Sequence, residues 1–121
     1  MGRTEYNDNA AFHLQLLSKV IDLNKFPMIK MVLEKNVTDS EYNELLQLLS
    51  RLNEKYEIQQ EEGLLDYSSL LIEFAGMLSE KLDPDATIYA LKKEGYYPSL
   101  MAAFIKIIEK DKRKYKRGRN Y

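Results

Sequence analysis

Signals that begin and end α-helices recur along this sequence and limit its fold more than any other feature. The clearest is a capping box over residues 38–41, in which the side chains of Thr38 and Glu41 satisfy two free backbone donors reciprocally. The other signals are prolines suited to a first helical turn and glycines suited to a helix end. They lie at Pro27, Gly63, Asp83-Pro84, Gly95 and Pro98.

Between these signals, apolar side chains recur every three or four residues, which is the spacing of one face of an α-helix. Strand signals are nearly absent, and no Asn-Gly or Asp-Gly hairpin turn occurs. The expected helices begin near residues 7–9, 27, 38, 67, 84 and 98, and a chain of 121 residues has the size of one domain. We therefore predict a single all-α domain over residues 1–109, a compact array of five or six short helices, followed by a basic C-terminal tail over 110–121.

Two of the expected helices carry further expectations about packing. The helix over 27–35 is apolar almost all round, so we expect other helices to enclose it. The helix over 67–82 contains Gly76, and a mid-helix glycine costs about 1 kcal/mol relative to alanine. We therefore expect a close helix crossing at Gly76, and we place the neighbouring Met77 on the core face of the same helix.

The composition excludes several classes of functional site. Cysteine is absent and His13 is the single histidine, so one chain holds no thiolate site and no pair of histidine ligands. No GxGxxG, phosphate-binding loop or GxSxG motif occurs. The glutamates between 54 and 62 crowd one helix end, and we interpret them as a solvated face rather than a metal site. We predict no catalytic residues, no metal and no cofactor.

The first expected helix has a wider apolar surface than so small a domain is expected to cover. Two apolar groups together span roughly 200° of this helix, whereas an ordinary surface helix needs a stripe somewhat over about 100° wide. The first group consists of Ala10, Leu14, Leu17 and Ile21, and the second group consists of Phe12, Leu16, Val20 and Leu23. Because large apolar patches are rare on monomers, we predict a homo-oligomer. The expected interface consists of Phe12, His13, Leu16, Leu17 and Val20, with His13 partly buried.

The C-terminal tail has a charge pattern unlike that of the rest of the chain. Residues 110–119 include seven basic residues and one acidic residue, although the net charge of the whole chain is −1. The cations and a tyrosine able to stack on a base are Lys110, Lys112, Arg113, Lys114, Tyr115, Lys116, Arg117 and Arg119. We interpret this segment first as a solvated helix end whose cations suit the helix dipole. The leading functional alternative is nucleic-acid binding, followed by an anionic membrane surface or an acidic protein partner.

Between residues 74 and 110, several groups of residues spread over successive expected helices indicate a family resemblance. Its features are Phe74-Ala75-Gly76, Glu80-Lys81-Leu82-Asp83, Thr87-Ile88 with Ala90-Leu91, and Leu100-Met101 with Phe104-Ile105. In these features the chain resembles the YhaI-like family of Bacillus-type bacteria. The first half resembles that family more loosely, through the leucine-rich first helix and Phe26-Pro27. The resemblance implies a small all-helical protein of unknown function and supplies no site residues.

The sequence alone assigns no specific activity. The leading hypothesis is a non-enzymatic interaction or regulatory protein that acts as a homo-oligomer, with a further protein partner left open. The alternative is a small nucleic-acid-associated protein that binds through residues 110–119, and a weaker alternative is an enzyme with an unrecognised pocket. The first ten residues lack an apolar run, and no stretch approaches the roughly 18 apolar residues of a membrane span. We therefore expect a cytoplasmic protein.

Overall fold

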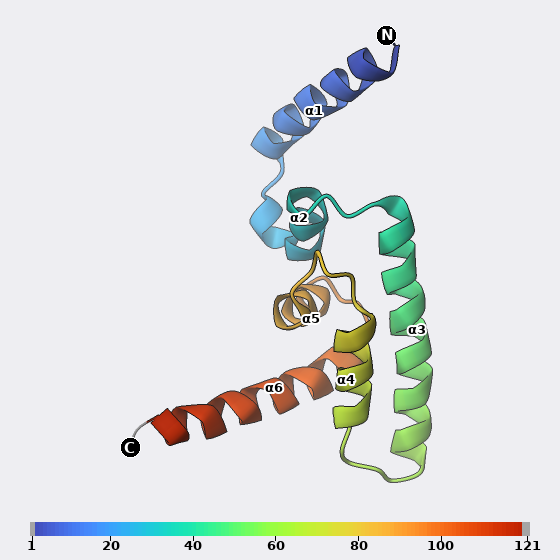
Figure 1. Ribbon diagram of the computed structural model, residues 1–121, viewed down its shortest axis with the longest axis vertical. Helices are drawn as coiled ribbons and strands as arrows, with labels where there is room; N and C mark the ends of the chain where they lie inside the picture. Colours follow the sequence, from blue (N-terminus) through green and yellow to red (C-terminus); the bar gives the residue numbers. More distant parts are fainter. Residues whose placement is uncertain (1, 120–121) are drawn as a thin grey trace.

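A computed structural model describes residues 2–119, and the side chains of residues 9–112, as an all-α protein (Figure 1). Its elements in chain order are α1 (Gly2–Val20), the 3₁₀ turn η1 (Leu23–Lys25), α2 (Pro27–Glu34), α3 (Asp39–Glu61), α4 (Ser68–Met77), α5 (Pro84–Lys93) and α6 (Pro98–Arg119). No strand occurs in this described range. The predicted all-α fold class is therefore confirmed.

The helices from α2 to α6 form the body of the protein. The long helix α3 lies antiparallel beside α4, α5 packs on both α2 and α6, and α6 also contacts α4 (Figure 1). Within the core, the fully buried rings of Phe74 and Phe104 lie with their centroids 5.8 Å apart. The other large buried side chains are Met28, Leu45, Leu48, Leu49, Leu52, Tyr56, Leu70, Leu82, Ile88, Leu91, Leu100, Met101 and Ile108.

Most helix boundaries lie where the sequence signals predict them. In the capping box, the Glu41 N–H donates to Thr38 Oγ1 at 3.1 Å, and the Thr38 N–H donates to Glu41 Oε1 at 2.9 Å. The Asp83 carboxylate caps α5 by accepting the Ala86 N–H at 2.8 Å. The glycines at 63 and 95 follow α3 and α5 with φ values of 78° and 84°, a left-handed conformation that ends helices and favours glycine.

The end of α4 differs from the sequence expectation. The helix ends at Met77 rather than near 82, because Leu78 adopts an extended backbone with ψ of 143°. Met77 is 62% exposed and does not belong to the core. A Cβ atom built on Gly76 would meet nothing within 4 Å, so no close helix crossing requires this glycine. The two expectations for Gly76 and Met77 are therefore wrong.

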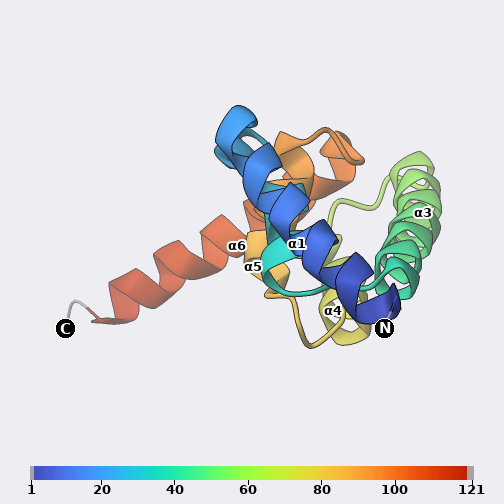
Figure 2. The same cartoon turned by 90° about the horizontal axis from the view of Figure 1, so that it is seen from above.

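The first helix stands apart from the body. Figure 1 shows α1 joined to α2 only through η1, and Figure 2 shows it passing above the other helices. Among residues 2–119, the pairs of helices that pack closely do not include α1. The helix begins at Gly2 instead of at the expected cap near Asn7–Asn9, so these asparagines lie inside it. An asparagine inside a helix costs only several tenths of a kcal/mol, which does not end a helix.

Candidate interaction surface

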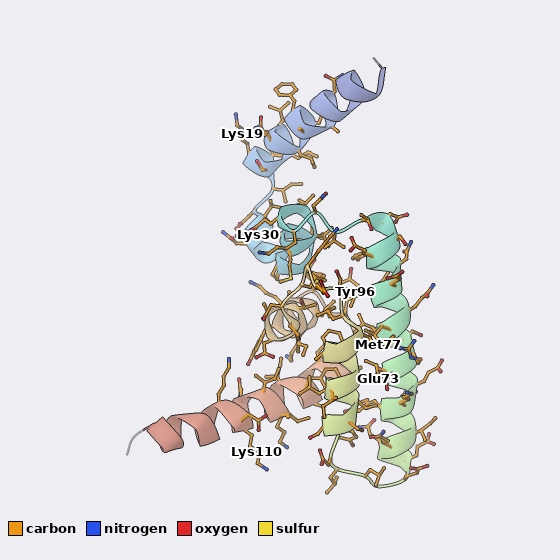
Figure 3. The ribbon with its side chains drawn as sticks, in the orientation of Figure 1. Lys19, Lys30, Glu73, Met77, Tyr96 and Lys110 are labelled. Atoms are coloured by element: carbon orange, nitrogen blue, oxygen red, sulfur yellow. The ribbon has the colours of Figure 1, made fainter. Side chains whose placement is uncertain are left out.

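Apolar side chains are exposed along the whole described length of α1. The exposed fractions range from 41% to 80% for Phe12, Leu14, Leu16, Leu17, Val20 and Ile21. Figure 3 shows the side chains of α1 projecting into open space, with no neighbouring helix beside them. Water therefore covers a surface whose composition is typical of a protein interior.

The apolar residues of α1 form two stripes on different sides of the helix. The first stripe contains Ala10, Leu14, Leu17 and Ile21, and the second stripe contains Phe12, Leu16 and Val20. At 100° per residue, the centres of the two stripes lie about 130° apart around the helix axis. The remaining side is polar, and there the Ser18 hydroxyl donates to the Gln15 carbonyl oxygen at 2.7 Å. A single flat contact therefore cannot cover both stripes.

The structure brings the five residues of the expected interface together on α1. Phe12, His13, Leu16, Leu17 and Val20 are all exposed. His13 was expected to be partly buried near the helix start or at a subunit contact, and within one chain it is exposed. Its ring lies 5.9 Å from the ring of Phe12, centroid to centroid. Whether these residues contact another molecule stays a prediction.

The outer face of α2 is a second apolar surface that the sequence reasoning missed. Met28 is buried on the inner side of this helix, which packs on α5. On the opposite side, Phe26, Ile29 and Leu33 are 42%, 45% and 44% exposed. The expectation that other helices enclose α2 is therefore wrong within one chain, because a two-turn helix beside α5 has only one covered side. We call these three residues the α2 outer face.

The basic end of the chain continues α6 beyond the body (Figure 1). Lys110 and Lys112 are exposed, and Figure 3 shows Lys110 directed away from α5. The Lys112 ammonium lies 5.8 Å from the centre of the Tyr89 ring, which is within the range of a cation–π contact. The other predicted contact residues lie outside the described side chains: Arg113, Lys114, Tyr115, Lys116, Arg117 and Arg119.

A groove of about 1030 Å³ opens between the end of α3, the start of α4 and one side of α6. The rings of Tyr56 and Tyr67 meet there edge to face, 4.8 Å apart, while Lys106 and Lys110 line the α6 side. At the start of α4, hydrogen bonds from Ser68 lower the pKa of Asp66. Besides these two lysines the lining includes Asp66 and Asp111, so the groove combines apolar walls with charged groups of both signs. Sequence reasoning missed it because its lining comes from three separate elements.

The described region holds one closely paired set of tyrosine hydroxyls. The Tyr42 and Tyr96 hydroxyls lie 2.8 Å apart, and this hydrogen bond together with burial raises the pKa of Tyr42 to about 12. Tyr42 therefore stays protonated near neutral pH, and the hydrogen bond ties α3 to the turn before α6. Among the described residues, no cluster of three acidic or histidine side chains is placed to hold a metal ion. None of its helices has the length and apolar character to cross a membrane.

A protein-family model matches most of the chain. The family model described as "Protein of unknown function (DUF1878)" matches residues 4–109 of the chain. The match includes α1 and the body, and it ends immediately before the basic segment. The expectation of a family without an assigned function is therefore confirmed.

Proposed function

We propose, from the premise that the chain belongs to the DUF1878 family of proteins of unknown function, that it is a non-enzymatic interaction protein that acts as a homo-oligomer. The observation that carries this proposal is the position of α1. The helix leaves the body, and five large apolar side chains of α1 together with the adjacent Ile21 are exposed. A surface of this kind is suited to binding another protein surface.

The area of this surface supports association. Taking about 170 Å² for a fully exposed large apolar side chain, the six side chains expose roughly 500 Å² of apolar area. The largest apolar patch on a typical monomer is about 300–600 Å² and is often functional. Here the area lies on a single helix that its own chain does not support. The binding of another copy would cover the apolar side chains and stabilise the helix at the same time.

Size-exclusion chromatography with light scattering tests the proposal. We expect the wild type to elute at a multiple of the 14.2 kDa chain mass, and Leu17→Glu to shift toward 14.2 kDa. The matched control is Gln15→Glu, which places the same charge on the polar side of the same helix and should keep the wild-type mass. A wild type that stays at 14.2 kDa at every concentration contradicts the proposal, and an unchanged Leu17→Glu mass contradicts α1 as the interface.

A second candidate function is the binding of nucleic acid by the basic end of α6. It is supported by the extension of α6 beyond the body and by the exposure of Lys110 and Lys112. In the same experiment, this function would appear as nucleic-acid absorbance that travels with the protein and is lost at high salt. A variant with the seven basic residues of 110–119 changed to glutamine would then lose that absorbance and keep its oligomeric mass.

The proposal also includes the subfamily of the protein and its location in the cell. We infer a YhaI-like protein of Bacillus-type bacteria from the helix pattern between residues 74 and 110. We also propose a cytoplasmic location, which agrees with the lack of a membrane-crossing helix among the described residues.

A further inference from the structure

The α2 outer face follows α1 directly along the chain. The backbone passes from Ile21 through η1 to Phe26, and α2 starts at the next residue. Two apolar surfaces, the stripes of α1 and the α2 outer face, are therefore exposed in succession within one connected segment, residues 10–33. The inner side of α2 packs on α5, and the described helices of the same chain leave its outer face exposed.

The exposed area of the two surfaces together matches the contribution of one partner to a stable interface. The α2 outer face adds roughly 200 Å² to the roughly 500 Å² of α1, on the same scale of about 170 Å² per side chain. Specific interfaces bury about 800 Å² on each partner. Neither surface alone reaches this value, whereas the two combined come close to it.

We propose that a second copy of the chain covers the α2 outer face with the second stripe of its α1, and that the arrangement is reciprocal. The inference rests on the proposed homo-oligomer and specifies its interface. Each contact then contains four helices, α1 and α2 from both copies. Reciprocal contact of identical surfaces is the rule for two-fold symmetric dimers, in which residue i of one copy meets residue j of the other and the reverse.

The spacing of the apolar residues indicates which surface of the partner each stripe of α1 contacts. In the first stripe the steps are four, three and four residues, which is the repeat of helices that pack along each other in coiled coils. This stripe therefore faces α1 of the partner. In the second stripe the steps are four and four, which builds a ridge of the kind that packs into a groove on a short helix. The α2 outer face, with steps of three and four residues, provides that groove.

The charges beside the surface favour a second copy over a charged partner. Lys30 on α2 lies 3.8 Å from Glu34 and donates to Asn24 Oδ1 at 3.1 Å. Asp22 accepts the Asn24 N–H at 3.0 Å within the same junction. These groups already have partners inside one chain, so the surface does not require an oppositely charged molecule. A surface that is apolar and whose charged groups are paired within the same chain can pack against the same surface of a second copy.

Disulfide cross-linking tests the contact directly, because the chain has no cysteine of its own. Leu16→Cys and Ile29→Cys chains with tags of different length are co-expressed, purified together and oxidised. We expect a mixed disulfide between the two tags, formed at several times the yield of the control pair Leu16→Cys and Ile72→Cys. Ile72 on α4 is 72% exposed and lies outside the proposed interface. A disulfide requires the two Cβ atoms to approach within about 4.5 Å.

A second measurement uses charge. Ile29→Glu should lower the oligomeric mass in light scattering, whereas Ile72→Glu should leave it unchanged, with circular dichroism showing that both variants keep their helices. A wild-type oligomer with no Leu16–Ile29 cross-link and an unchanged Ile29→Glu mass overturns this inference and leaves the proposed function standing. A wild type that stays monomeric at all concentrations overturns both this inference and the proposed homo-oligomer. The exposed surface would then be a binding site for a different protein.

Discussion

At the scale of single residues, Glu41 joins three parts of the body. Its carboxylate accepts the Lys81 ammonium at 2.6 Å and the Thr38 N–H at 2.9 Å, while Lys81 also donates to the Asn36 carbonyl oxygen at 2.8 Å. The hydrogen bonds from Lys81 and Thr38 lower the pKa of Glu41 from its usual 4.5 to about 2. The start of α3 is thus fixed to the loop that precedes α5.

This ion pair predicts a pH dependence of stability. A carboxyl group with a lower pKa in the folded chain stabilises the fold above pH 4.5 and loses that contribution as the pH falls toward about 2. Glu41→Gln keeps an amide that can complete the capping box but removes the charge. We expect its melting temperature to be lower than that of the wild type near neutral pH, with the difference closing as the pH approaches 2. Thermal unfolding followed by circular dichroism measures this, and Glu54→Gln, exposed on α3, should match the wild type throughout.

At the scale of helices, α2 begins without a cap from its own segment. Its N-cap residue is Phe26, which has no side-chain hydrogen bond to the helix. The Glu94 carboxylate, just past the end of α5, takes this role by accepting the Met28 N–H and, at 3.3 Å, the Ile29 N–H. A negative charge at a helix N-terminus is also favoured by the helix dipole. One side chain therefore completes the start of α2 and holds it against α5.

Removal of this cap should destabilise the body measurably. In Glu94→Ala the Met28 N–H loses its acceptor at a residue that is 1% exposed, and the loss of a cap costs about 1–2 kcal/mol. We expect the free energy of unfolding in urea to fall by this amount. The control Glu54→Ala removes an exposed carboxylate from α3 and should change the value by less than about 0.5 kcal/mol. Equal effects of the two variants would contradict the capping role of Glu94.

The helices differ in how much of them the sequence predicts. The starts of α3 and α5 follow from Thr38, Glu41 and Asp83, because these caps act within three residues. The cap of α2 could not be predicted, since Glu94 lies more than sixty residues from Met28 and only the packing of α2 on α5 brings them together. The sequence predicts the wide apolar surface of α1, but it does not predict that the α2 outer face is exposed. A helix sequence that is apolar all round predicts that the helix is buried, but it does not show whether the same chain or another molecule buries it.

At the scale of the whole molecule, the body and α1 obtain their stability from different sources. The body has a shared core of side chains from α2 to α6. The 19 residues of α1 lack such support within one chain, and most helical stability in proteins comes from the packing of an apolar face against other elements. The asparagines and aromatic residues of α1 are weaker helix formers than alanine. Association should therefore stabilise the helical state of α1 itself.

Hydrogen exchange can test this coupling between folding and assembly. In the assembled wild type we expect the amides of α1 to exchange at least about tenfold more slowly than in the Leu17→Glu monomer, because each opening of the helix must also break the interface. Dilution of the wild type should remove the α1 protection first, since the dissociated chain has nothing to hold the helix. The amides of α3 and α5 should keep the same protection in both proteins, which serves as the internal control. Equal protection of α1 in the assembly and in the monomer would show that the helix is stable alone, and the link between its folding and association would then fail.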